Sequence, residues 1–231
     1  KIIFLPNTYQ PNDNTRKISK ITTNRFDFNL PSDGLVFCCF NNNYKITNSE
    51  FEIWMRVLKK INNSVLWLLK SNQWAEKNLK NEARKRNINI NRIIFAENIP
   101  PDRHLERHKH ADLFLDTFNC NAHTTASDSL WSGLPVVTKI GSQFAARVAS
   151  SLLSSIGLSE LITRNEQEYE SLIIDLGENV TKLDQIKKKL KINSKSYPLF
   201  DTELYTYNFE KALKIVYKLN KKNLDTKDLV I

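Results

Sequence analysis

Glycine is scarce in this chain, with five glycines among 231 residues. Neither a G-x-G-x-x-G pattern nor a Walker A pattern occurs, which argues against the glycine-rich phosphate loops of dinucleotide-binding and P-loop proteins. The longest apolar stretches, 34–40 and 64–69, have the length of strands and fall far short of the ~18 residues that span a bilayer. No secretory leader pattern is visible. We therefore expect a soluble, cytoplasmic protein, and we interpret the chain as a piece of a longer one.

Cysteine is also rare, and the three cysteines, Cys38, Cys39 and Cys120, show no C-x-x-C spacing. This pattern predicts neither a disulfide framework nor a zinc site, and we expect buried free thiols. His104 and His108 have a spacing at which two rings on a helix can share a metal ion, but no carboxylate or cysteine at a suitable spacing completes the ligand set. We therefore expect no metal site.

Positive charge exceeds negative charge, with 34 Lys and Arg against 25 Asp and Glu, for a net charge of +9. The excess is dispersed. Its densest run, 187–191, falls in a segment where Leu183, Ile186 and Leu190 would form the buried side of an amphipathic helix, so a solvated face is expected there. Nucleic-acid binding is an alternative, but it needs a clustered basic face with interleaved aromatic residues, which the sequence does not offer.

The pattern along the chain divides it into three parts. Residues 1–30 are irregular apart from a short apolar strand at 2–5, and we interpret them as a linker. From 31 to 219, short β-branched and aromatic runs alternate with longer segments of helical spacing, as expected of one folded domain. Residues 220–231 form a charged tail that we expect to fray.

The alternation predicts an α/β fold. The expected strands are 35–40, 64–70, 92–96, 112–116 and 135–138. The first expected helix begins at an N-cap at Asn48 or Ser49. The other expected helices cover 73–87, 101–110, 124–132, 143–156, 166–178, 181–192 and 202–219. Alternating strands and helices need right-handed crossovers, so we predict a Rossmann-like parallel sheet with helices on both faces, followed by C-terminal helices. Ligands of such sheets bind at the carboxyl ends of the strands.

Several polar residues follow the predicted strand 112–116. His123, Thr124 and Thr125 lead into a helix that carries Asp128 in its first turn. A helix N-terminus offers unpaired N–H groups and a partial positive charge, and two hydroxyl groups add donors, so this turn suits a phosphate group. The alternative is an ordinary threonine N-cap.

Two further candidates follow other predicted strands. Lys45 lies in a polar turn after 35–40, where its ammonium group could neutralise a diphosphate. The alternative for Lys45 is a solvated surface lysine. His104 lies near the start of the helix expected over 101–110, just after the strand 92–96, and is placed to stack on a planar base.

The sequence around these residues resembles a known family, the O-linked N-acetylglucosamine transferases of glycosyltransferase family forty-one. The resemblance is to their C-terminal catalytic lobe, covers residues 1 to about 218, and rests on the strings FNNNYK (40–45), NRIIFAENIP (91–100) and ADLFLDTFNCNAHTTASDSLWSGLPVVT (111–138). The opening LPNTYQPND (5–13) is similar to the segment leading into that lobe in bacterial members with tetratricopeptide repeats. This resemblance implies a GT-B glycosyltransferase, whose second Rossmann-like lobe holds the nucleotide sugar.

The resemblance also implies roles for the phosphate-binding residues. Lys45 would contact the UDP diphosphate and, as the catalytic residue of this lobe, stabilise charge on the leaving UDP in place of a divalent cation. The turn His123, Thr124 and Thr125 would hold the diphosphate. Asn42 stands where many relatives carry the longer Gln, so its contact to the diphosphate or sugar is expected to be shortened or lost.

The remaining implied roles concern the nucleoside. His104 would stack on uracil, the backbone near Ile99 would read the edge of the base, and Asp128 would accept hydrogen bonds from the ribose hydroxyls. Pro101 falls where some members carry a lysine near the base, which puts that extra contact in doubt.

The function expected from the resemblance is the donor-binding lobe of a UDP-sugar-dependent protein O-glycosyltransferase, metal-independent and inverting. The expected donor is UDP-N-acetylglucosamine or a related UDP-sugar, and the expected acceptor is a Ser or Thr of a protein held by N-terminal regions outside these residues. The fragment alone is expected to be inactive, and no cofactor, nucleic acid or membrane partner is expected. The alternative is a non-catalytic nucleotide-sugar-binding or scaffold module.

Overall fold

A parallel sheet forms the centre of the computed structural model, which describes residues 1–225 and 227–231. Its strand order is β4-β3-β2-β5-β6-β7, and every neighbouring pair is parallel. The strands are β2 (Leu35–Cys39), β3 (Ser64–Leu69), β4 (Ile93–Ala96), β5 (Leu113–Leu115), β6 (Val136–Lys139) and β7 (Ile162–Thr163). The five strands predicted for this sheet are confirmed, and the two-residue β7 at its edge was missed because its apolar run is too short to give a pattern.

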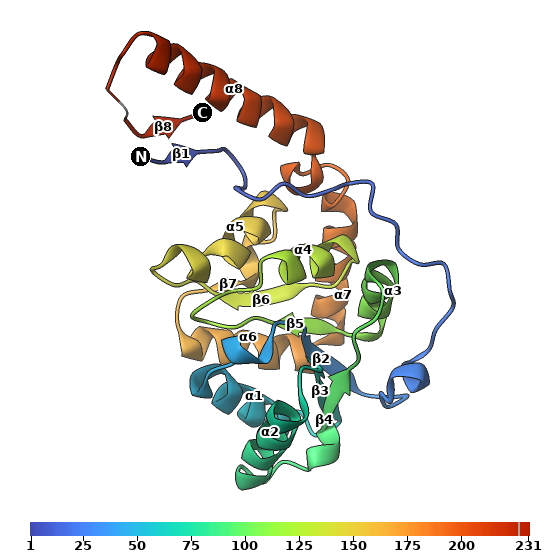
Figure 1. The fold of residues 1–231 in the computed structure, drawn as a ribbon. Helices are drawn as coiled ribbons and strands as arrows, with labels where there is room; N and C mark the ends of the chain where they lie inside the picture. Colours follow the sequence, from blue (N-terminus) through green and yellow to red (C-terminus); the bar gives the residue numbers. More distant parts are fainter. Residues whose placement is uncertain (226) are drawn as a thin grey trace.

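Helices cover both faces of the sheet, which confirms the predicted fold class (Figure 1). One face carries α1 and α6, which pack against each other, and the other carries α3, α4 and α5 in sequence. The helices are α1 (Asn48–Lys60), α2 (Gln73–Lys85), α3 (Pro101–Arg107), α4 (Thr124–Trp131), α5 (Val148–Ser155), α6 (Glu166–Glu178), α7 (Val180–Asn193) and α8 (Thr202–Lys221).

Three helix boundaries differ from the prediction for a visible structural reason, and those of α2, α4, α7 and α8 differ by no more than two residues. The N-cap of α1 is Thr47, not Asn48 or Ser49, because Thr47 has an extended backbone and forms a capping box with Glu50. The helix expected over 101–110 ends its α-helical part at Arg107 and continues as a 3-10 turn. The helix expected over 143–156 is a 3-10 turn, Phe144–Ala146, followed by α5.

The core lies between the sheet and its two helical layers. Cys38 and Cys39 of β2 are fully buried, as expected of a parallel strand covered on both faces, and all three cysteines are free thiols. Cys120 is only partly buried, so the prediction of buried thiols is wrong for this one. The two largest buried side chains, Trp54 of α1 and Trp67 of β3, lie on these layers as well.

The basic run at 187–191 lies on α7, whose apolar side is buried as predicted. Lys187 is not simply solvated, because its Nζ lies 3.1 Å from Oδ1 of Asp112 at the start of β5. No helix within residues 1–225 and 227–231 combines the length and the apolar character that crossing a bilayer requires.

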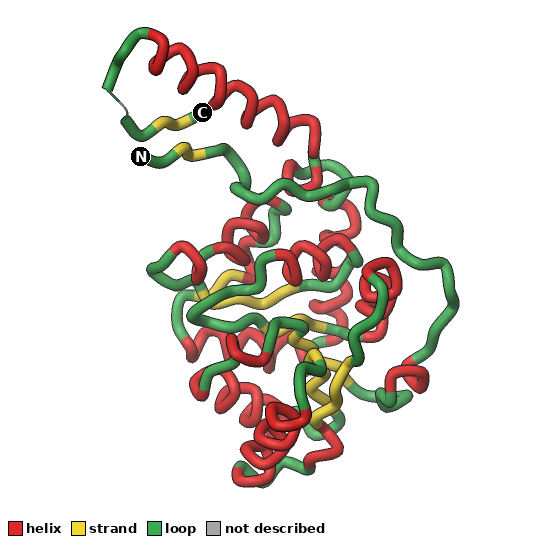
Figure 2. The backbone as a smooth tube through the Cα atoms, viewed as in Figure 1, coloured by secondary structure: helices red, strands yellow, loops and turns green. Residues whose placement is uncertain are grey.

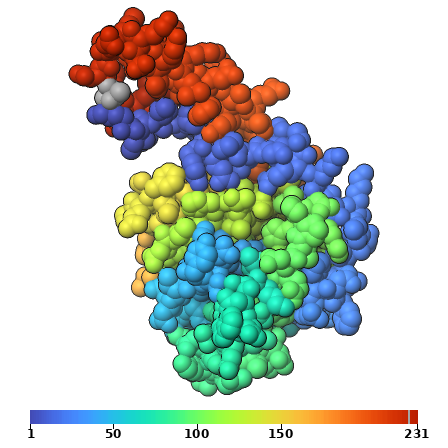
Figure 3. All heavy atoms as spheres, viewed as in Figure 1, coloured from blue at the N-terminus to red at the C-terminus, as the bar shows by residue number. Residues whose placement is uncertain are grey.

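The N-terminal segment, residues 5–24, is a long loop that runs along the outside of the lobe and contacts it (Figures 2 and 3). Asn12 is buried: its side-chain oxygen accepts a hydrogen bond from the hydroxyl of Ser127 on α4 at 2.6 Å, and its nitrogen donates to the carbonyl oxygen of Leu199 at 3.1 Å. The residues interpreted as a linker are therefore fixed to α4 and to the turn before α8.

Both ends of the chain meet beside α8. The strand β1 (Ile3–Phe4) pairs in parallel with β8 (Leu229–Val230), so the prediction that the tail frays is wrong for these two residues of the tail. We call α8, β1 and β8 the terminal arm. It projects from the lobe, and the only side chain of α8 that is buried is Ala212 (Figure 1).

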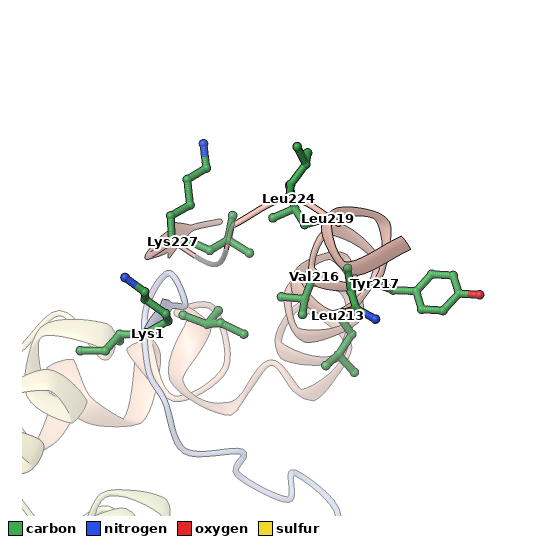
Figure 4. Close-up of a pocket in the computed structure, with 11 residues that line it drawn as sticks. Lys1, Leu213, Val216, Tyr217, Leu219, Leu224 and Lys227 are labelled. Atoms are coloured by element: carbon green, nitrogen blue, oxygen red, sulfur yellow. The ribbon is translucent and has the colours of Figure 1, made fainter. Parts of the chain in front are cut away.

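The terminal arm contains a hollow of about 510 Å³ (Figure 4). Most side chains that line it are apolar, and they come from β1, β8, α8 and the turn that follows α8. Lys1 and Lys227 are among the few charged residues in its lining.

Candidate functional site

A cavity of about 440 Å³, the sheet-edge pocket, opens where β2, β3 and β4 end. Five of the eight predicted site residues line it: Ile99, His104, Thr124, Thr125 and Asp128. The other lining residues are Arg16, Phe40, Leu69, Asn98, Pro101, Leu105 and Arg107. The site therefore lies at the carboxyl ends of the parallel strands, as the topology predicts.

One wall of the pocket is aromatic. The ring centre of His104 lies 5.3 Å from that of Phe40 and 4.7 Å from that of His108, and both pairs pack edge to face. Burial, with the neighbouring His108 and Arg107, lowers the pKa of His104 to about 3. His104 is therefore neutral at pH 7 and offers an uncharged ring against which a planar group can pack.

His108 packs against His104 within this wall. It is fully buried, and its Nδ1 lies 2.7 Å from the carbonyl oxygen of His104, to which it donates. Burial lowers the pKa of His108 to about 4. Across the part of the chain that the structure describes, no group of three or more His, Cys, Asp and Glu side chains is arranged to hold a metal ion.

The N-terminus of α4 also lines the pocket. His123 occupies the N-cap position and makes no capping hydrogen bond with its side chain, so the alternative of an ordinary threonine N-cap does not hold. The hydroxyl of Thr125 donates to Oδ1 of Asn41 at 2.5 Å, whereas Thr124 is exposed. The first turn of α4 therefore presents backbone N–H groups that its cap residue does not satisfy.

A buried carboxylate, Asp116, fixes the loop that leads from β5 to α4. Its Oδ1 accepts hydrogen bonds from the backbone N–H groups of Ala122 at 2.6 Å and Thr117 at 2.8 Å, and its Oδ2 accepts one from the hydroxyl of Thr138 at 2.7 Å. Burial raises the pKa of Asp116 to about 7, although these donors oppose the rise. Asp116 was predicted only as the end of a strand, and its role in holding this loop was missed.

Asn41 connects this loop to the first strand of the sheet. It follows β2, is buried, and its Nδ2 donates to the hydroxyl of Thr117 at 2.8 Å while its oxygen accepts from Thr125. The ends of β2 and β5 and the start of α4 are therefore joined by one buried polar network.

Lys45 and Asn42 lie beside the pocket rather than in its lining. The Nζ of Lys45 donates to the carbonyl oxygen of Asn121 at 3.0 Å, so its ammonium group is fixed on the loop before α4. This contact argues against the alternative of a freely solvated lysine. Asn42 is exposed, and its side chain bonds the hydroxyl of Tyr44 at 3.3 Å.

His123 faces the N-terminal segment instead of the pocket. Its Nδ1 lies 3.1 Å from the hydroxyl of Tyr9, and its Nε2 lies 3.4 Å from the carbonyl oxygen of Ala145. Desolvation lowers the pKa of His123. The side chain of His123, which was predicted to bind phosphate, therefore makes its hydrogen bonds with Tyr9 and Ala145, outside the lining of the pocket.

Asp128 forms an ion pair with Arg16, which comes from the N-terminal segment. The guanidinium carbon of Arg16 also lies 5.7 Å from the ring centre of Trp131. Burial raises the pKa of Asp128, and the charge of Arg16 opposes that rise. The carboxylate expected at the ribose therefore already has a cationic partner.

A sequence profile described as glycosyl transferase family 41 matches residues 8–209. The chain belongs to this family. It is 36% identical over 200 residues to the UDP-N-acetylglucosamine-peptide N-acetylglucosaminyltransferase of Caenorhabditis elegans, covering 87% of this chain and 17% of that protein. It is 34% identical over 226 residues to the probable enzyme of the same name, SEC, of Arabidopsis thaliana, covering 95% of this chain and 23% of that protein. The family 41 chain thus spans about a fifth of the length of these relatives.

Solved structures of glycosyltransferases share the fold of this chain. A mutant O-GlcNAc transferase of Thermobaculum terrenum superimposes with a TM-score of 0.74 at 28% identity, covering 78% of this chain and 35% of that one. TarM of S. aureus, a mutant in complex with UDP among other ligands, gives a TM-score of 0.55 at 14% identity over 89% of this chain and 38% of that one, a likeness of fold alone. The family 41 chain has the fold of one lobe of a GT-B glycosyltransferase, which confirms the resemblance.

The residues missed by the sequence prediction are mostly the ones that position the others. Arg16 is an isolated arginine in an irregular segment, and nothing in its surroundings marks it. Arg107 is almost fully buried, with its guanidinium carbon 4.8 Å from the ring centre of Phe40. The signal for Asp116 and Asn41 was weak but present, because each is a polar residue directly after a buried apolar run.

Proposed function

We propose that this lobe binds the donor of a protein O-glycosyltransferase that transfers N-acetylglucosamine from UDP-N-acetylglucosamine to a Ser or Thr hydroxyl. The observation that carries the proposal is the sheet-edge pocket, which lies beside an N-terminus of α4 without a side-chain cap and an ammonium group fixed on the adjoining loop. Family membership supports the same reaction class. The free cysteines are compatible with action in the cytoplasm, which is part of the proposal.

The diphosphate would lie at the start of α4. In the transfer, the acceptor hydroxyl oxygen would bond to the anomeric carbon of the sugar while the bond from that carbon to the diphosphate oxygen breaks. A general base outside these residues would take the hydroxyl proton. The electron pair of that bond remains on UDP, so negative charge grows there. The N–H groups of α4 and the ammonium group of Lys45 would stabilise this charge without a metal ion, and a single displacement of this kind inverts the anomeric carbon.

The uracil would lie against the aromatic wall. The neutral ring of His104 suits stacking on a base, and Ile99, whose backbone would read the edge of the base, also lines the pocket. Pro101, also in the lining, has neither a cationic side chain nor a backbone N–H, so a cationic contact to the base is not expected from this position.

The proposal is tested by titrating UDP calorimetrically into the full chain and into Lys45→Ala. Removing an ammonium group from a diphosphate should weaken binding by roughly ten- to a hundredfold, or about 1.4–2.7 kcal/mol. Lys214→Ala is the matched control, because it removes an exposed lysine from the terminal arm. Wild-type affinity in Lys45→Ala, or no binding of UDP by the unaltered chain, would contradict the proposal.

Transfer itself is tested on the full-length protein that contains this lobe. Radiolabelled N-acetylglucosamine should pass from its UDP-sugar to an acceptor protein, and Lys45→Ala should reduce that transfer. Binding of UDP without any transfer would instead support the alternative of a non-catalytic nucleotide-sugar-binding module.

A further inference from the structure

Arg16 is the one residue of the N-terminal segment that lines the sheet-edge pocket. It is separated by 112 positions from Asp128, with which it forms a partly buried ion pair. Its guanidinium group also packs over Trp131 at the end of α4. The segment thus closes one side of the pocket with a side chain that the sheet and its helices do not supply.

The hydrogen bonds of Arg16 are incomplete. Its Nε donates to the carbonyl oxygen of Asp13 at 3.2 Å, and its Nη1 is paired with Asp128. Its Nη2 is buried and has no hydrogen-bond partner among the residues that the structure describes. A buried donor without an acceptor is costly, and an oxygen atom of a ligand in the pocket would remove that cost.

A ribose hydroxyl has the right chemistry for this pair. Its hydrogen can be donated to a carboxylate while its oxygen accepts a hydrogen bond from a neighbouring donor. Both residues line the pocket: Asp128 provides the acceptor, and the guanidinium group paired with it provides a donor in Nη2. Because a guanidinium group holds its nitrogens in a rigid plane, one pairing to Asp128 also fixes the direction of the remaining donor.

We propose that Arg16 is part of the ribose site: it positions the carboxylate of Asp128 and donates a hydrogen bond from Nη2 to a ribose hydroxyl oxygen of the bound nucleotide. The proposal rests on the proposed function, because it assumes that UDP occupies the sheet-edge pocket. It makes the N-terminal segment a component of the donor site, whereas the sequence suggested only a linker.

The test compares UDP with its 2′-deoxy and 3′-deoxy analogues by calorimetry on the full chain. The unaltered chain should bind at least one deoxy analogue about tenfold more weakly than UDP. Arg16→Ala should bind UDP about tenfold more weakly and should lose most of the difference between UDP and that analogue. Lys17→Ala is the matched control, because it removes an exposed cation one position along the same segment and should leave both affinities unchanged.

Further variants separate the roles of charge and geometry. Arg16→Lys keeps the charge but not the planar set of donors, so it should lose the discrimination against the deoxy analogue as Arg16→Ala does. If Arg16→Ala does not show the thermal unfolding transition of the unaltered chain, Arg16→Gln replaces it in the test. In Asp128→Asn, a further Arg16→Ala change should have little effect, because the two residues act as a pair.

The outcomes distinguish this inference from the proposed function. If the unaltered chain binds no UDP, both fail. If it binds UDP and Lys45→Ala weakens that binding, but folded Arg16 variants keep the full discrimination against both deoxy analogues, then the ribose role of Arg16 is wrong and the proposed function stands.

Discussion

Two of the hollows in the described residues have similar size and opposite chemistry. The sheet-edge pocket, at about 440 Å³, is bordered by a helix N-terminus, an aromatic wall and an ion pair. The hollow of the terminal arm, at about 510 Å³, is lined mainly by aliphatic side chains. The hollow of the terminal arm has few groups that can recognise a polar ligand. Between these two hollows, convergent polar groups rather than volume mark the candidate nucleotide site.

The two regions also differ in how firmly their side chains are held. Buried hydrogen bonds of Asp116 and Asn41 hold the ends of β2, β5 and β6 together, and most residues of these strands are buried. In the arm, α8 has one buried residue along its 20 positions. We therefore expect substitutions at the pocket to change stability and binding strongly, and substitutions in the arm to change them little.

The largest effect should come from Asp116→Ala. It leaves several buried donors without an acceptor, so the free energy of unfolding should fall by about 3 kcal/mol or more. Asp116→Asn keeps one acceptor oxygen and should lose less. Urea unfolding followed by circular dichroism measures both. A loss of unfolding free energy no greater than that of Leu213→Ala in the arm would contradict the expected difference between the two regions.

The next effect concerns pH and His108. Its pKa of about 4 in the folded chain lies below the ordinary value of 6.5, so the unfolded chain takes up the proton first as pH falls. The free energy of unfolding should therefore decrease between pH 6.5 and pH 5, with about 1–2 kcal/mol of the decrease due to this group.

His108→Phe keeps an aromatic ring of similar shape and removes the titrating group. Its free energy of unfolding should depend less on pH over the same interval than that of the unaltered chain. Denaturant unfolding at pH 6.5 and at pH 5 measures this difference, and equal pH dependence in both proteins would exclude the role of His108. The arm contains no histidine, so it should add nothing to this effect.

A smaller effect is expected for Thr125→Val, which keeps the shape of the side chain. It removes the hydroxyl that donates to Asn41, so the free energy of unfolding should fall by about 1 kcal/mol. Thr206→Val is the control, because its hydroxyl bonds only a carbonyl oxygen within α8. Thermal unfolding of both variants would show whether the buried network matters more than a hydrogen bond on the arm.

The smallest effect should come from Leu213→Ala, in the lining of the arm hollow. About half of this side chain is exposed, so the change should cost well under the roughly 2–5 kcal/mol of a buried leucine and leave UDP binding unchanged. Calorimetry with UDP and urea unfolding check the two parts. A loss of UDP affinity would show that the two hollows are coupled.

The fold could be predicted from the sequence because its dominant signal is local. Buried parallel strands are continuous apolar runs, and the helices between them have clear spacing, so 166–178 was predicted to the residue as α6. The pairing of β1 with β8 could not be predicted, since it joins segments more than 220 positions apart and neither pattern specifies its partner.

The site was predictable only in part. Thr124, Thr125 and Asp128 follow a strand and open a helix, which is a local pattern that places them at the sheet edge. The contact of Arg16 with Asp128 depends on the path of an irregular segment, and such a path leaves no periodic trace in the sequence. His123 was placed on the correct turn, but the tertiary contact with Tyr9 that directs its side chain was not visible.

The pairing of Ile3 with Leu229 closes the polypeptide into a near loop. A short flexible bridge could join the two ends, and the exposed turn at Asn87, between α2 and β4, could supply new ones. Such a circular permutant would keep every strand of the sheet intact while reversing which half of the lobe leaves the ribosome first. The order of synthesis could then be separated from the order of assembly.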